Sequence, residues 1–85
     1  MTSASAVSRA LRVGGLRPLP SGTPYTREGL RVSRSLQRVR VVADLDSEAR
    51  AAELATLAAA ILSEAGYTID PTDQPVAFYV TSRTP

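Results

Sequence analysis

The sequence predicts a small α+β domain, in which a mostly antiparallel sheet of three to five strands has one long and one short helix packed on one face. Three observations lead to this fold class. Residues 47–65 contain eight alanines and neither proline nor glycine, as in a helix. Residues 30–34 and 38–45 alternate apolar and polar side chains, as in half-buried strands. The chain of 85 residues has room for one domain, which we expect to span residues 1–85.

The long helix is expected to cover at least residues 48–63. Asp46 is the predicted N-cap, and Gly66 is the predicted left-handed residue that ends the helix. The face expected to pack on the sheet consists of apolar residues at helical spacing: Leu54, Leu57, Ala58, Ile61, Leu62 and Ala65.

The N-terminal part is expected to hold the short helix. Residues 1–5 are predicted to be a flexible tail, and Ser5 is predicted to cap a helix that ends at Gly14 and Gly15. Three prolines follow between residues 16 and 24, so this stretch reads as an irregular connection with an edge strand at residues 16–19.

The remaining strands follow from residue pattern. Residues 30–34 and 38–45 are predicted to form a hairpin, and residues 67–69 and 76–82 two further strands. The predicted order is therefore helix, three strands, helix, two strands. The strand residues expected to face the long helix are Leu30, Val32, Val39, Val41, Ala43, Leu45, Val76, Phe78 and Val80.

Charge is distributed unevenly along the chain. Residues 1–43 carry eight arginines and one glutamate, a net +7, whereas residues 44–85 carry two arginines and seven acidic residues, a net −5. Such asymmetry indicates an anionic partner for the basic half. Alternatively, the two halves neutralise each other within the fold.

Several chemistries lack the residues that they need. The chain contains no Cys, no His and no Lys, which removes thiolate, imidazole and Schiff-base chemistry. Asp44 and Asp46 are explained by a strand end and a helix cap rather than by a metal site. We therefore expect no catalytic residues, no metal and no cofactor. No apolar run approaches the roughly 20 residues needed to cross a bilayer, so we expect a cytoplasmic protein without a membrane partner.

The predicted site is the sheet face that points away from the long helix. Strand alternation places Arg31, Arg38 and Arg40 on that face, with Arg27 in the same parity and Tyr79 on the last strand. Arginine binds phosphate through two hydrogen bonds, and tyrosine offers a ring on which a base can stack. The structural alternative is a solvated face on which arginine stems cover apolar surface.

The expected function is that of a small non-enzymatic accessory or regulatory protein that binds DNA or RNA through this face. The arginine- and alanine-rich composition is typical of GC-rich genomes and fits a phage or mobile-element protein. The alternative is a protein-interaction or self-assembly module, in which the basic half of one copy meets the acidic half of another copy or of a protein partner.

Overall fold

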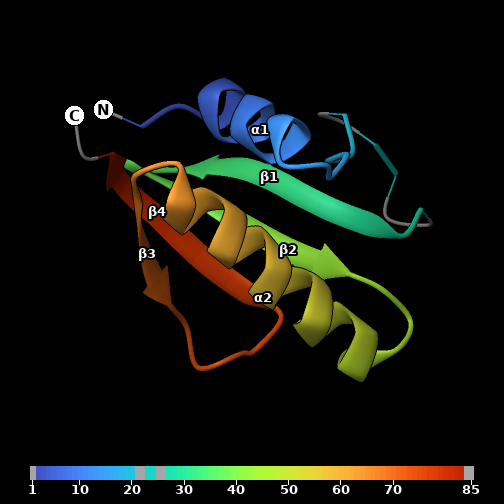
Figure 1. Ribbon diagram of the computed structural model, residues 1–85. Coiled ribbons are helices and arrows are strands. Elements are labelled where there is room, and N and C mark those ends of the chain that lie inside the picture. The colour runs from blue at the N-terminus through green and yellow to red at the C-terminus, as the bar shows by residue number, and fades with distance from the viewer. Residues whose placement is uncertain (1, 21–22, 25–26, 84–85) are drawn as a thin grey trace.

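The computed structural model describes residues 2–20, 23–24 and 27–83. Its two helices and four strands occur in the order α-β-β-α-β-β, which confirms the α+β class (Figure 1). The elements are α1 (Ala4–Val13), β1 (Gly29–Ser35), β2 (Arg38–Asp44), α2 (Glu48–Glu64), β3 (Tyr67–Pro71) and β4 (Ala77–Arg83).

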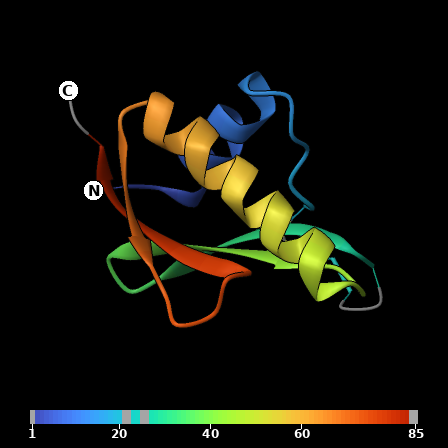
Figure 2. The ribbon, with the colours of Figure 1, turned by 60° about the horizontal axis from the view of Figure 1, so that its bottom comes forward.

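The four strands form one antiparallel sheet in the order β1-β2-β4-β3. The predicted hairpin is confirmed, because β1 pairs with β2 from Gly29↔Asp44 to Ser35↔Arg38. Strand β4 lies between β2 and β3, so α2 crosses the sheet to connect two strands that are not neighbours. Both helices lie on the same face of the sheet, and none of the described residues forms a helix on the opposite face (Figure 2).

Helix α2 has the predicted extent but a different N-cap. Ser47 Oγ accepts a hydrogen bond of 3.3 Å from the Arg50 N–H, so Ser47 and not Asp46 caps the helix. The Asp46 N–H instead donates to Glu28 Oε1 at 3.1 Å, which ties the chain just before α2 to the residue preceding β1. The helix ends as predicted before Gly66, which has a φ of 92°.

The buried face of α2 agrees in part with the predicted one, because Ala58 and Leu62 are buried and Leu54, Ile61 and Ala65 are partly buried against the core. Its buried residues are Ala51, Ala55, Ala58 and Leu62, while Leu57 is 50 % exposed. Placing Leu57 in the core was therefore wrong. Apolar residues surround most of this helix, so helical periodicity does not select one face. The face that packs in the core is formed mainly by the small side chains of alanines, together with Leu62.

Helix α1 starts earlier than predicted. Ser3 is its N-cap and accepts from the Ala6 N–H at 3.1 Å, and Thr2 is buried at 7 % exposure. Residues 2–5 therefore belong to the fold and not to a tail, whereas Met1 lies outside the described residues. Val7 and Leu11 are fully buried and form the inner face of this helix.

The predicted edge strand at residues 16–19 does not form. Only the Leu19 N–H donates to the neighbouring strand, to the Leu30 carbonyl at 2.8 Å. Pro18 and Pro20 have no N–H to continue a ladder. Leu19 lies against Gly29, where an added Cβ would come within 2.8 Å of the Leu19 side chain. The segment therefore follows the free edge of β1 without extending the sheet.

The core lies between the sheet and the two helices. Among the strand residues predicted to face inward, Val32, Leu45 and Val76 are only partly buried, and Val76 precedes β4. The others are at most 4 % exposed: Leu30, Val39, Val41, Ala43, Phe78 and Val80.

Candidate nucleic-acid interface

The face of the sheet without helices carries the predicted site residues on β1, β2 and β4. Directly opposed residues of paired strands share a face. Arg40 of β2 pairs with Tyr79 of β4 and with Ser33 of β1, so these three residues share a face. Arg31 and Arg38 have the same parity along their strands. Four of the five predicted residues therefore project from one side of the sheet, and Arg27 lies in the preceding loop.

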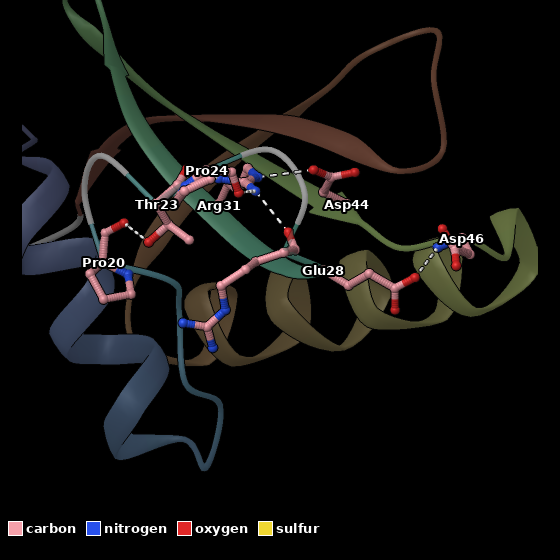
Figure 3. A network of polar contacts seen from close by, with 8 residues as sticks. Pro20, Thr23, Pro24, Glu28, Arg31, Asp44 and Asp46 are labelled. Carbon is pink, nitrogen blue, oxygen red and sulfur yellow. Dashed lines mark hydrogen bonds and ion pairs between the residues drawn. The ribbon is translucent and has the colours of Figure 1, made fainter.

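Arg31 is occupied by contacts within the chain (Figure 3). Its Nε donates to Asp44 Oδ2 at 3.0 Å. Nη1 donates to the Thr23 carbonyl at 2.9 Å, and Nη2 donates to the carbonyls of Pro24 and Arg27 at 2.8 Å each. The side chain is only 17 % exposed. The planar guanidinium, with five donors, holds the loop before β1 against the sheet.

This network assigns Arg31 a structural role in place of the predicted phosphate contact. At one end of the sheet face, Arg31 is bound to the backbone carbonyls of Thr23, Pro24 and Arg27. Arg27 contributes its backbone carbonyl to the network, and its side chain is exposed. In the described part of the chain, Arg27 does not line the depression around Tyr79. The structure therefore separates Arg27 and Arg31 from the other three predicted residues.

The other end of the face brings Arg38, Arg40 and Tyr79 together. The Arg38 Cζ atom lies 3.9 Å from the centroid of the Tyr79 ring, which is a cation–π contact. Arg40 is exposed and adjacent to Tyr79 across the β2–β4 pairing. No hydrogen bond or ion pair is found for its side chain among residues 2–20, 23–24 and 27–83. We call Arg38, Arg40 and Tyr79 the sheet-face cluster.

Two acidic residues border the sheet-face cluster. Arg38 Nη1 lies 3.7 Å from Asp70 Oδ2, and the two side chains are 40 % and 56 % exposed. Ion pairs this exposed contribute about 0 to 1 kcal/mol, so a stronger anion can displace Asp70 from Arg38. Asp73 lines the same depression, which has a volume of about 390 Å³.

The loop after β3 forms the rim of this depression. Thr72 Oγ1 lies 2.9 Å from both the Gln74 and the Ala77 carbonyl oxygens and accepts from the Gln74 N–H at 3.1 Å. Ala77, predicted to point outward, is 5 % exposed. Asp70 and Thr72 were not predicted as site residues, because they lie between the strands predicted at residues 67–69 and 76–82. The β3–β4 register places Asp70 opposite Tyr79, and Thr72 lines the same depression, with its Oγ1 beside the Ala77 carbonyl oxygen.

In the described part of the chain, no group of three or more acidic residues is arranged to hold a metal ion. Asp44, the first acidic residue of the Asp44–Asp46 pair, is bound to Arg31. None of the helices in this part is long and apolar enough to cross a membrane.

The chain matches no protein-family model, no curated protein and no solved structure. Its function therefore has to be inferred from the geometry of the site itself.

Proposed function

We propose that this protein is a non-enzymatic nucleic-acid-binding module whose sheet-face cluster contacts single-stranded DNA or RNA. The observation that carries the proposal is the arrangement of Arg38 over the Tyr79 ring, with Arg40 directly beside it. We also propose that the protein is encoded by a phage or mobile element and acts in the cytoplasm, where DNA and RNA occur.

The two arginines supply the phosphate contacts. Arg40 is exposed and has no partner in the described residues, so it can bind a phosphate without losing an existing interaction. Arg38 exchanges its weak contact with Asp70 for a phosphate oxygen. Each contact releases counterions from the nucleic acid, which makes binding weaker as the salt concentration rises.

The stacking contact favours single strands. Bases stack on aromatic rings and on arginine guanidinium planes when they are not paired in a duplex. Arg38 lies on Tyr79 and its side chain is 40 % exposed, so a base can add to this stack. A duplex keeps its bases inside and offers only phosphates to the cluster.

Replacement of Tyr79 tests the stacking contact. Tyr79→Leu should weaken binding to a single-stranded oligonucleotide by about 1 to 3 kcal/mol and change binding to a duplex little. Tyr79→Phe keeps the ring and should retain the affinity of the native protein. The measurement is fluorescence anisotropy with labelled oligonucleotides at low salt, after circular dichroism has shown that both variants are folded. Equal losses for Leu and Phe, or no binding by the native protein, would refute the proposal.

Self-assembly is the second candidate function. The Arg31–Asp44 pair removes one predicted phosphate contact, which leaves fewer arginines for a nucleic acid and so gives weight to the alternative. Glu48, Glu53 and Glu64 of α2 are exposed and offer an acidic surface to the arginines of another copy. Light scattering at low salt separates the two functions. A monomer that binds oligonucleotides supports the first, and an oligomer that dissociates with salt and binds no oligonucleotide supports the second.

A further inference from the structure

A second group of arginines lines a groove on the side of the molecule that carries α1. The groove runs between α1, the segment after it and β1, and has a volume of about 1220 Å³. Four arginines line it: Arg9, Arg12, Arg17 and Arg34. None of them was predicted as a site residue, since the predicted site lies on the sheet face that points away from the long helix.

The described residues that line the groove include arginines but no acidic residue. Arg9, Arg12 and Arg17 are all exposed, and within the described part of the chain no hydrogen bond or ion pair is found for their side chains. Arg34 donates from Nε to the Leu36 carbonyl at 3.4 Å. By contrast, the depression at the sheet-face cluster contains Asp70 and Asp73. The groove is therefore the more attractive surface for an extended anion.

The spacing within the groove suits a chain of phosphates. Arg9 and Arg12 are three residues apart on α1, which places their Cβ atoms about 5 to 6 Å apart on one side of the helix. Arg12 also lies in the last turn of the helix, where the dipole favours a positive charge. The dipole accounts for Arg12 but not for Arg9 or for Arg17 beyond the helix end. Binding of a polyanion would explain the positions of all three arginines.

The groove is continuous with the sheet-face cluster around the edge of β1. Leu19, Pro20, Val32 and Ser33 line both the groove and a second depression on the sheet face. Arg40 lines this second depression as well as the one around Tyr79. One surface path therefore leads from Arg9 and Arg12, past the β1 edge, to Arg40.

We infer that this groove binds the sugar–phosphate backbone of the single strand whose bases contact the sheet-face cluster. The inference rests on the proposed function and extends the binding site from one face of the sheet to both sides of its edge. Arg9, Arg12 and Arg17 contact phosphates only, so they add affinity without sequence preference.

Strand length and charge removal together test the inference. A strand of about 4 nucleotides reaches only the sheet-face cluster, whereas one of about 12 nucleotides also follows the groove. Arg9→Gln/Arg12→Gln should weaken binding of the longer strand about tenfold at low salt and lower the magnitude of the log-affinity versus log-salt slope by about 1.4. Binding of the shorter strand should not change. Arg50→Gln, which removes an exposed arginine from α2, is the matched control and should leave both strands unaffected.

The outcomes distinguish this inference from the proposed function. Suppose that the double variant binds the longer oligonucleotide with the affinity of the native protein, whereas Tyr79→Leu binds it more weakly. The groove inference then fails and the sheet-face proposal stands. If the double variant binds both oligonucleotides more weakly by the same factor, the groove inference also fails, because the loss then reflects the overall charge of the protein. If the native protein binds neither strand, both proposals fail. A membrane surface is the other possible ligand of the groove. If the native protein binds phosphatidylserine vesicles but no oligonucleotide, and the double variant does not bind the vesicles, the inference is overturned.

Discussion

The two faces of the sheet are made by the same strands but contribute differently to the molecule. Val39, Val41 and Val80 face the helices and are fully buried, so they stabilise the fold by removing apolar surface from water. Arg38 and Arg40 alternate with these valines on β2 and face outward. The difference shows that one strand can contribute to the core on one side and present charged side chains on the other, because successive side chains point in opposite directions.

The outward face is itself divided. Arg31 at one end is 17 % exposed and holds a loop, whereas the Arg38 side chain near the other end is 40 % exposed. Residue type and strand parity are identical, so neither explains the difference. At one end the backbone before β1 provides three carbonyl acceptors, whereas Arg38 meets a tyrosine ring and an exposed carboxylate.

The largest expected effect concerns the buried face. Leu62→Ala should lower the free energy of unfolding by about 3 to 5 kcal/mol, since Leu62 is fully buried in the core. Leu57→Ala is the matched control on the same helix and should cost about 1 kcal/mol or less, because Leu57 is half exposed. Urea denaturation measures both. Equal costs would mean that the buried face of α2 has been assigned incorrectly.

A smaller loss of stability is expected from the structural end of the outward face. Arg31→Gln should cost about 2 to 4 kcal/mol, because it leaves Asp44 and three carbonyls without their charged donor. Arg31→Lys keeps the charge but cannot form the fork of hydrogen bonds, so it should recover only part of the loss. A chemical denaturation midpoint for Arg31→Gln within error of that for Arg40→Gln would remove the distinction between the two ends.

The contact between the two helices should show a still smaller effect. A Cβ added at Gly14 would lie 2.4 Å from Ile61 Cγ2, so Gly14→Ala should cost about 1 to 3 kcal/mol through overpacking. The φ of Gly14 is −79°, so no backbone strain contributes. In an Ile61→Ala background the same substitution should cost much less, and a double-mutant cycle measures this coupling. Independent effects would place α1 away from α2.

Much of the fold was predictable from the sequence because local patterns determine it. Alternation gave the β1–β2 hairpin, and Gly66 marked the end of α2. The orientation of α2 was predictable only in part, since alanines lie all around it and helical periodicity does not select one face. The cap was predicted one residue early, as Asp46 and Ser47 are both good N-cap residues.

The candidate site was predictable only in part. Strand parity placed Arg38, Arg40 and Tyr79 on one face, but it does not report tertiary contacts. The engagement of Arg31 depends on carbonyls of residues 23, 24 and 27, whose positions no periodic pattern indicates. The basic groove joins α1 to β1, which are distant in sequence, so its arginines become neighbours only in the folded chain.

The most direct test of phosphate binding by the sheet face is the salt dependence of oligonucleotide affinity for the native protein and for Arg38→Gln/Arg40→Gln. Both substitutions keep side-chain length and polarity and remove one charge each. If the two arginines contact phosphates of a single strand, the magnitude of the slope of log affinity against log salt should fall by about 1.4, with the free energy of unfolding changed by less than about 1 kcal/mol. An unchanged slope for a folded double variant would contradict phosphate binding by the sheet-face cluster.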